Sequence, residues 1–178
     1  MKLQIKKYGH PILRKIAEPI KEIDGEIIGF ASNMCATIAS FNAIGLSANQ
    51  AGKAKRIFVA KNEERLLVFI NPKIISQTGA EIATEGCLSF PGLFGEIERA
   101  ITVVVSAISL QGKEIKIIAR DLLARAIQHE IDHLDGILFI DRADKKERKR
   151  MLSQWKEIKC NRSGSIRWRN GERGELKK

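Results

Sequence analysis

Residues 128–136 read QHEIDHLDG and hold two of the three histidines of this chain. This short stretch limits the possible folds and functions more than any other part of the sequence. Positions i and i+4 lie on one face of a helix, one turn apart, so His129 and His133 can bind a single metal ion. Glu130, beside the first histidine, is suited to exchange a proton with water at such a site. From the motif at residues 129–133 alone, an equally good interpretation is that the two histidines are ordinary helix residues that bind no metal.

The residues around this motif predict a helix from Asp121 to Leu134, with Asp121 as N-cap and Gly136 as the stop. At about 100° per residue the helix has three stripes. We expect the histidine stripe to line a pocket, an apolar stripe to face the core and a polar stripe to face water. In that order, the members are Leu122, Ala126, His129 and His133; Leu123, Ile127, Ile131 and Leu134; and Arg125, Gln128, Asp132 and Asp135.

Length and composition indicate one globular domain. The chain has 178 residues, of which 44% are hydrophobic and 29% charged, values that are ordinary for a protein with a sizeable core. No apolar run approaches the ~20 residues that a transmembrane helix needs, and the first residues lack the apolar core of a signal peptide. We therefore expect a cytoplasmic protein outside the membrane. The three widely spaced cysteines, Cys35, Cys87 and Cys160, form no disulfide framework.

The net charge of +10 is concentrated at the C-terminal end. Residues 1–141 contain 17 Lys and Arg and 16 Asp and Glu, whereas residues 142–178 contain 14 and 5. Such asymmetry is typical of a segment that contacts a polyanion. A solvated helix face followed by a disordered end explains it equally well.

The remaining pattern predicts a single α+β domain in which antiparallel sheet packs around the central histidine helix. Apolar residues recur at helical spacing in 24–41, a second helix is expected at 145–159, and small residues in 42–50 favour a turn. Candidate strands are 56–60, 66–71, 73–76, 80–84, 97–109 and 113–119, bounded by Gly- and Pro-containing breaks. We divide the chain into a catalytic part, residues 1–144, and a basic C-terminal helix with a flexible tail, residues 145–178.

A catalytic zinc-type site needs a third protein ligand and an open position for water. Carboxylates follow the motif at Asp141, Asp144, Glu147 and Glu157, in or beside the charged C-terminal helix, where exposure to solvent is the simpler interpretation. Cys87 lies in a loop-like segment outside any alternating apolar pattern, unlike Cys35, which we assign to the core. Cys87 is therefore the preferred third ligand, and we assign His10 a structural or surface role.

Three segments, in order along the chain, resemble the motifs of the peptide deformylase family. They are Gly45–Gln50, Glu85–Ser89 and Gln128–His133, and flanking residues at 8–14, 71–72 and 132–136 are also similar. The resemblance covers about residues 3–141. Each motif is short, but the three together in a chain of this length are highly specific.

The resemblance implies removal of the N-formyl group from the initiator methionine of new polypeptides, with release of formate. It implies that Cys87, His129 and His133 bind one divalent ion, Fe²⁺ in the cell, which Zn²⁺, Ni²⁺ or Co²⁺ can replace. Such an ion lowers the pKa of bound water toward ~7. Glu130 would accept the proton and return it to the leaving amine.

The resemblance also implies that Gln50 and the backbone N–H of Leu88 stabilise the oxyanion; loss of one such donor typically costs about 10²–10³ in rate. The residues expected to contact the substrate are Ile44, Gly45, Leu122, Arg125 and Ala126. The first two would hold the substrate backbone as an added strand. The last three, on or beside the histidine stripe, would form the methionine pocket and its rim. We give Glu85 a structural role and expect it to pair with Arg99.

Two positions depart from the family pattern: Ala43 stands where glycine is usual, and Ser47 where alanine is usual. Neither change removes a ligand or a catalytic group, so we expect activity to be retained. Family members of this kind can dock on the ribosome through a basic C-terminal helix, because rRNA is a dense polyanion. The residues that fit this role are Lys145, Lys146, Arg148, Lys149 and Arg150.

Two other classes of function remain open. One is a different HExxH metallohydrolase, such as a zinc peptidase, whose third ligand is a downstream carboxylate. The other is an RNA-binding module without enzymatic activity that uses the basic tail. Only 6% of residues are aromatic, which is few for the stacking platforms common in such modules.

Overall fold

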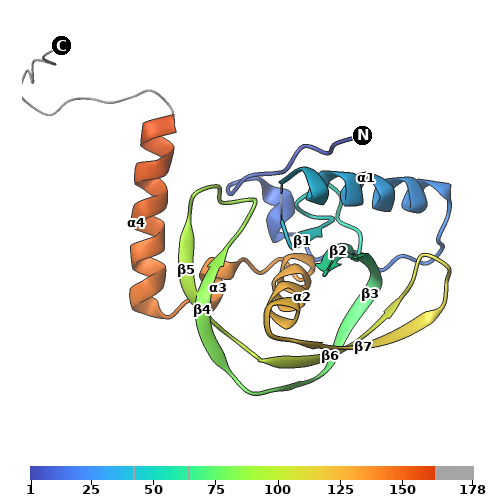
Figure 1. Ribbon diagram of the computed structural model, residues 1–178. Helices are drawn as coiled ribbons and strands as arrows, with labels where there is room; N and C mark the ends of the chain where they lie inside the picture. The colour runs from blue at the N-terminus through green and yellow to red at the C-terminus, as the bar shows by residue number, and fades with distance from the viewer. Residues whose placement is uncertain (42, 64, 163–178) are drawn as a thin grey trace, which may run out of the picture.

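The computed structural model describes residues 1–41, 43–63 and 65–162, and their elements surround one central helix, α2 (Figure 1). Helix α2 (Asp121–Leu134) has the predicted bounds, and α1 (Gly25–Phe41) begins one residue later than expected. The remaining helices are the short 3₁₀ helix η1 (Pro11–Arg14), α3 (Phe139–Arg142) and α4 (Lys145–Arg162). The predicted α+β class, with a central HExxH helix and a C-terminal helix, is confirmed.

The strands form two antiparallel sheets. Five strands pair in the order β1-β2-β3-β6-β7, and β4 and β5 form a separate hairpin. Their bounds are β1 (Gly45–Ser47), β2 (Ile57–Asn62), β3 (Arg65–Thr78), β4 (Glu81–Gly86), β5 (Phe94–Arg99), β6 (Thr102–Ile108) and β7 (Glu114–Arg120). Predicted strands 66–71 and 73–76 are one strand, β3. Pro72 is accommodated because the register with β6 shifts between Ile70 and Lys73, and a bulge tolerates a missing N–H.

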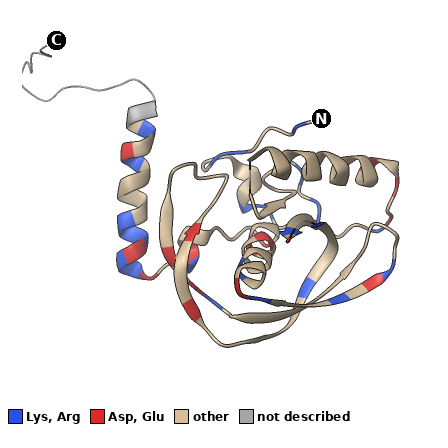
Figure 2. Cartoon of the chain, viewed as in Figure 1, with Lys and Arg blue, Asp and Glu red and all other residues tan. Residues whose placement is uncertain are grey.

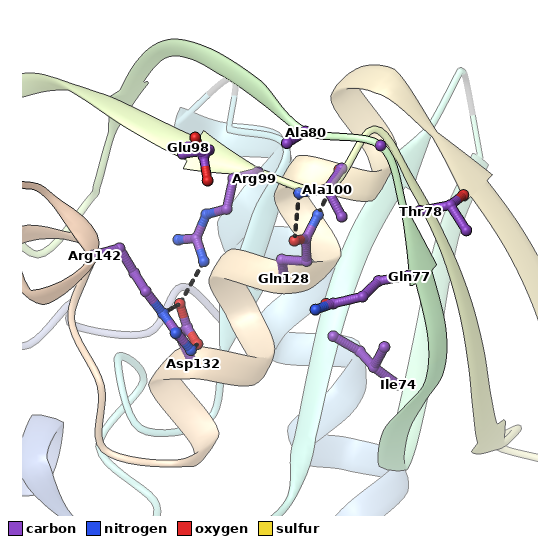
Figure 3. A pocket seen from close by; sticks show the side chains of 11 residues that line it. Ile74, Gln77, Thr78, Ala80, Glu98, Arg99, Ala100, Gln128, Asp132 and Arg142 are labelled. Atoms are coloured by element: carbon purple, nitrogen blue, oxygen red, sulfur yellow. Dashed lines mark hydrogen bonds and ion pairs between the residues drawn. The ribbon is translucent and has the colours of Figure 1, made fainter.

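The predicted strand 97–109 is divided at Ala100 into β5 and β6, which belong to different sheets. The Gln128 side chain on α2 uses both backbone groups of Ala100 (Figure 3). Its Oε1 accepts from the Ala100 N–H at 3.0 Å, and its Nε2 donates to the Ala100 carbonyl at 2.9 Å. These groups are therefore not available to a neighbouring strand, and the chain passes here from the hairpin to the large sheet.

The prediction that the polar stripe of α2 faces water is wrong for three of its four members. Arg125, Gln128 and Asp132 are only 8%, 7% and 4% exposed, whereas Asp135 reaches solvent. The β4–β5 hairpin and the residue that follows it contact this side of the helix, because Arg125 donates to the Ile97 carbonyl and Gln128 accepts from the Ala100 N–H. Burial is possible because each side chain has polar partners; two arginines, for example, donate to the Asp132 carboxylate (Figure 3). Helical periodicity alone does not reveal such partners.

The apolar stripe of α2 faces the core, as predicted. Ile127 and Leu134 are fully buried in one cluster with the stacked rings of Phe58 and Phe69. The predicted N-cap is wrong: Arg120 occupies that position without a side-chain cap, and Asp121 is the first residue of the helix. Gly136, with φ of 72°, follows the end of the helix as predicted. Cys35 packs against the core, also as predicted.

Helix α4 stands at one side of the molecule (Figure 1), and apolar residues anchor it. Met151 and Trp155 are 0% and 6% exposed and belong to a cluster with Leu13, Phe90 and Phe139. The division of the chain at residue 144 remains a prediction. The part of the predicted tail at residues 163–178 lies outside the described residues.

Polar side chains of α4 also form hydrogen bonds with backbone groups of β5. Glu147 accepts a hydrogen bond from the Glu96 N–H at 2.9 Å, and Arg150 donates to the Phe94 carbonyl at 2.9 Å. Lys and Arg residues gather in the first turns of α4 (Figure 2). None of the helices in the described ranges combines the length and apolar character of a transmembrane span.

Candidate metal centre and active site

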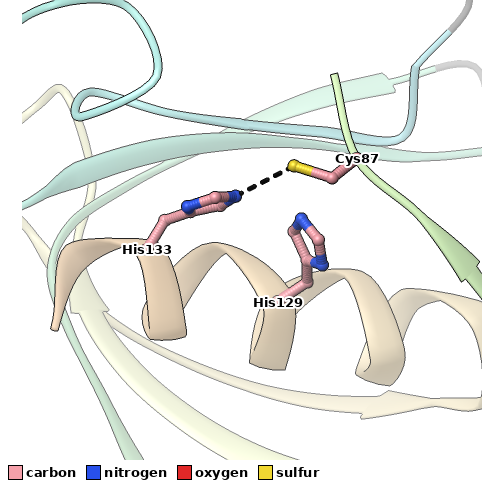
Figure 4. Close-up of side chains that lie close together, drawn as sticks. All are labelled: Cys87, His129 and His133. Atoms are coloured by element: carbon pink, nitrogen blue, oxygen red, sulfur yellow. Dashed lines mark hydrogen bonds between the residues drawn. The ribbon is translucent and has the colours of Figure 1, made fainter. Parts of the chain in front are cut away.

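The structure brings Cys87 together with the two histidines of α2 (Figure 4). One ligand atom from each of the three residues lies within 4.8 Å of the others. Cys87 Sγ lies 3.3 Å from His133 Nε2. Cys87 directly follows β4, so the end of the hairpin places the sulfur over the helix. Among the residues that the structure describes, this is the one group of Cys, His, Asp or Glu side chains arranged to share a metal ion.

The downstream carboxylates do not join this cluster. Asp141 forms ion pairs with Arg14 and Arg148, and Glu147 pairs with Arg150. The choice of Cys87 over these carboxylates is therefore consistent with the geometry.

Glu85 holds the first histidine from the side opposite the cluster. Its Oε1 lies 2.6 Å from His129 Nδ1, which leaves Nε2 for the cluster. Arg99 donates two hydrogen bonds to the same carboxylate, at 2.9 and 3.1 Å, and Arg125 donates one at 3.2 Å. Metal-binding histidines usually have such a partner, because it fixes the tautomer and the orientation of the ring. The predicted Glu85–Arg99 pair is confirmed; the contact with His129 was not predicted.

The charges of the cluster favour a cation at its centre. Burial raises the pKa of Glu85, but hydrogen bonds from His129 and Arg99 outweigh it and hold that pKa well below its usual range. Burial lowers the pKa of His129, yet the Cys87 sulfur and Glu85 raise it well above its usual value. Burial and the neighbouring His129 both lower the pKa of His133. One sulfur and two imidazoles in such surroundings fit a divalent transition metal.

Glu130 lies between α2 and β1, beside this cluster. It is 3% exposed, and burial raises its pKa to about 7. Its Oε2 has no hydrogen-bond partner among the described residues. A buried carboxyl group with a near-neutral pKa and one unpartnered oxygen is suited to take up and return a proton.

Two hydrogen-bond donors border the cluster. Gln50 is 1% exposed, and its Nε2 lies 3.4 Å from Cys87 Sγ. No described residue accepts a hydrogen bond from the Leu88 N–H, and the next N–H, of Ser89, points to the same sulfur at 3.4 Å.

The predicted turn at 42–50 is wrong in part, because residues 45–47 form β1, which pairs with β2 before the chain turns.

A cavity of about 530 Å³ opens beside the cluster. The predicted substrate-contacting residues all line it, as do Gln50, Leu88 and Glu130. Leu122, 59% exposed, lies at the mouth. The prediction that Arg125 lies at the rim is wrong, because its guanidinium is buried between Glu85 and the Ile97 carbonyl. A second cavity, of about 450 Å³, surrounds Asp132 behind α2 and contains none of the cluster's ligands (Figure 3).

A family model, polypeptide deformylase, matches residues 2–149 of this chain. The chain belongs to the polypeptide deformylase family. A peptide deformylase of Carboxydothermus hydrogenoformans is 49% identical over 146 residues, which are 82% of this chain and 96% of that protein. Because the members of this family are enzymes, the chain is an enzyme. Membership also accounts for the three motifs at residues 45–50, 85–89 and 128–133.

Solved structures of the family have the same fold. The peptide deformylase of Legionella pneumophila is 32% identical, with a TM-score of 0.85 over 92% of this chain and 98% of that chain. A class I type b peptide deformylase of Acinetobacter baumannii, solved with Met-Ala-Ser bound, is 32% identical, with a TM-score of 0.78 over 80% and 99%.

Sequence reasoning missed how the N-terminal segment joins the deformylase motifs. The Lys6 N–H donates to the Gln50 carbonyl at 2.8 Å, and the Lys7 ammonium donates to the Leu88 carbonyl at 2.9 Å. The Tyr8 N–H donates to the carbonyl of the residue after Leu88 at 2.9 Å. This segment therefore ties together the two loops that carry the donors beside the cluster. The similarity of residues 8–14 to the family was the only signal of this role.

Proposed function

We propose that this chain removes the N-formyl group from the formyl-methionine of nascent polypeptides and releases formate. The observation that carries the proposal is the cluster of Cys87, His129 and His133, which borders a cavity lined by Cys87, His129 and Glu130. Family membership supports the same reaction. The Met-Ala-Ser bound in the Acinetobacter baumannii deformylase is the peptide that remains when a formyl group leaves formyl-Met-Ala-Ser.

Cys87, His129 and His133 would hold one divalent ion, Fe²⁺ in the cell, with Zn²⁺, Ni²⁺ or Co²⁺ able to replace it. When bound, such an ion supplies Lewis-acid chemistry, because it polarises a carbonyl and lowers the pKa of a coordinated water. The buried thiol and imidazoles support this assignment, and Glu85 keeps the His129 ring in the required orientation.

The chain's own groups account for the remaining steps. Gln50 Nε2 and the Leu88 N–H would donate to the formyl oxygen as it becomes negative. Glu130 would accept a proton from the attacking water and pass it to the leaving amine. The near-neutral pKa of Glu130 supports both transfers.

The cavity walls support binding of an extended peptide. Strand β1 lies at the edge of its sheet, so Ile44 and Gly45 would pair with the substrate backbone as an added strand. Leu122 and Ala126 would surround the methionine side chain. Arg125 would form the base of this pocket, since Glu85 holds it there.

The test is formate release from formyl-Met-Ala-Ser, with protein purified without oxygen and loaded with Fe²⁺ or Ni²⁺. We expect turnover, its loss in Glu130→Ala, and no change in Glu114→Ala, because Glu114 is exposed on β7. Metal analysis runs beside the assay. Bound metal without turnover would overturn the proposed substrate, and absence of metal binding would overturn the assigned ligands.

The rival interpretations make different predictions for the same variants. A zinc peptidase with a carboxylate ligand would keep its metal in Cys87→Ser, whereas the proposed site should lose it or bind it weakly. An RNA-binding module would keep its function in Glu130→Ala. Neither rival requires Gln50 beside the Cys87 sulfur, and the RNA-binding interpretation gives the buried Glu130 no role.

We also propose that α4 docks on the ribosome, which would place the enzyme in the cytoplasm where nascent chains emerge. The lysines and arginines of its first turns support contact with rRNA (Figure 2). Arg148 and Arg150 are engaged with carboxylates, so the informative variant replaces Lys145, Lys146 and Lys149 with glutamine. This leaves Met151 and Trp155 in place, unlike truncation.

Co-sedimentation with ribosomes at several salt concentrations tests this docking. We expect binding to weaken with salt and the triple variant to bind less tightly, with a smaller salt slope. The control replaces the exposed lysines 73, 113 and 116 with glutamine, on strands and a turn away from α4. Equal loss of binding in both triple variants would indicate a nonspecific charge effect and overturn the role of α4.

A further inference from the structure

Ser47 is a fully buried polar residue at the end of β1, and it contacts one of the proposed oxyanion donors twice. Its exposed fraction is 0%. Gln50 Oε1 accepts a hydrogen bond from the Ser47 backbone N–H at 2.9 Å and another from the Ser47 hydroxyl at 3.1 Å. Both bonds come from one residue and end on one oxygen.

These bonds determine which end of the Gln50 amide faces the reaction. A carboxamide has one acceptor end and one donor end, and the two are related by a 180° flip. Because two donors hold Oε1 on the side of β1, Nε2 must lie on the other side, where it contacts Cys87 Sγ at 3.4 Å. A flipped amide would place its NH₂ against the Ser47 backbone N–H, which cannot accept a hydrogen bond, and the hydroxyl could then act only as an acceptor.

The hydroxyl adds to what the backbone alone provides. An alanine at position 47 would keep the backbone bond and lose the second one. A single bond lets the amide rotate about it, whereas two donors at different positions resist rotation in both directions. Ser47 also lies close enough to Glu130 to lower the pKa of that carboxyl group, so the test must separate the two partners.

We propose that Ser47 is a positioning residue for deformylation, acting through Gln50: its hydroxyl holds the amide so that Nε2 faces the formyl oxygen. This inference rests on the proposed function, since it assigns Gln50 the role of oxyanion donor.

The experiment is a double-mutant cycle of Ser47→Ala and Gln50→Ala, with formyl-Met-Ala-Ser as substrate. We expect Ser47→Ala to lower kcat roughly 3- to 10-fold with little change in KM, a smaller loss than the 10²–10³ typical when a donor itself is removed. In the Gln50→Ala background, Ser47→Ala should cause no further loss. Ser106→Ala, at a partly buried strand serine that does not line the cavity beside the cluster, should leave kcat unchanged.

A second measurement does not depend on turnover. The side-chain NH₂ signals of Gln50, assigned by their absence in Gln50→Ala, should shift in Ser47→Ala protein without substrate. If those signals shift but neither the wild type nor any variant removes the formyl group, the positioning stands and the proposed function fails. If the signals do not shift, or if Ser47→Ala lowers kcat equally in both backgrounds, the hydroxyl does not act through Gln50 and the inference is overturned.

Discussion

The backbone of Gly45 faces the Glu130 side chain so closely that β1 and α2 can approach only because residue 45 lacks a side chain. A Cβ at this position would lie 2.7 Å from Glu130 Cγ and 2.8 Å from Cδ. Real Cβ atoms essentially never show contacts under 3.0 Å, so the glutamate or the strand would have to shift. The position of the proposed acid/base therefore depends on a glycine in the neighbouring strand.

Replacing Gly45 with alanine should consequently impair catalysis more than metal binding. Because a displacement of about 1 Å can cost roughly 10²-fold in rate, we expect kcat/KM for formyl-Met-Ala-Ser to fall by at least tenfold, with metal content unchanged. Gly29→Ala is the matched control, since a Cβ at Gly29 in α1 meets nothing within 4 Å. An active Gly45→Ala enzyme would show that the carboxylate has room to move without consequence.

Glu85→Gln should weaken both the metal centre and the fold. The substitution leaves His129 with a weaker partner and removes the negative charge between Arg99 and Arg125. We expect metal affinity to fall by about 10- to 100-fold and the free energy of unfolding to fall by roughly 3–5 kcal/mol, as when a buried ion pair is broken. Metal titration and urea unfolding measure the two effects. Glu98→Gln, exposed on the same hairpin, should change neither.

The parts of the site that the sequence predicted are those that neighbouring residues in the chain determine. The spacing of His129 and His133 follows from helix geometry, so α2 could be predicted with its bounds. Cys87 could be chosen as third ligand because its segment lacks the alternation of a packed strand. Its distance from the histidines, however, depends on where the β4–β5 hairpin lies relative to α2, which no local pattern encodes.

What could not be predicted is the identity of distant polar partners. The three buried residues of the polar stripe look like a solvated face because the partners of their side chains lie in other elements, such as Ala100 for Gln128. The same side chain divides a continuous apolar strand pattern into two strands. Ser47 likewise looks like an inert small residue until Gln50 folds back onto it.

The buried carboxyl group of Glu130 should make the metal-free protein less stable as pH rises. Burial raises its pKa to about 7 from 4.5, so the folded state binds the proton more tightly than the unfolded state. Above pH 7, where Glu130 is charged in the folded state, its burial lowers the free energy of unfolding by the full amount. This destabilisation disappears as pH falls toward 4.5. At 1.36 kcal/mol per pKa unit, the cost at pH 8 is about 3 kcal/mol.

Urea unfolding of metal-free protein between pH 5 and pH 8 tests this linkage. We expect Glu130→Gln to be more stable than the wild type at pH 8 and the difference to shrink steadily toward pH 5, although the variant loses activity. Glu114→Gln should give a small difference that does not vary in this way. A Glu130→Gln protein that is less stable at pH 8 would contradict the effect of burial.

Trp155 should anchor α4 through its ring rather than through its indole N–H. The ring packs against Phe90 at 5.2 Å and Tyr8 at 6.2 Å between centroids, whereas Nε1 has no hydrogen-bond partner among the described residues. We expect Trp155→Ala to lower the free energy of unfolding by about 3–5 kcal/mol, as is typical for loss of a large buried aromatic ring. Trp155→Phe should cost much less, because it keeps most of the apolar contact and removes a buried donor without a partner.

Lys156→Ala, on the exposed side of the helix, should change stability by less than about 0.5 kcal/mol. Urea unfolding of the three variants decides the matter: equal losses for alanine and phenylalanine at position 155 would mean that the N–H, and not the ring, holds the helix.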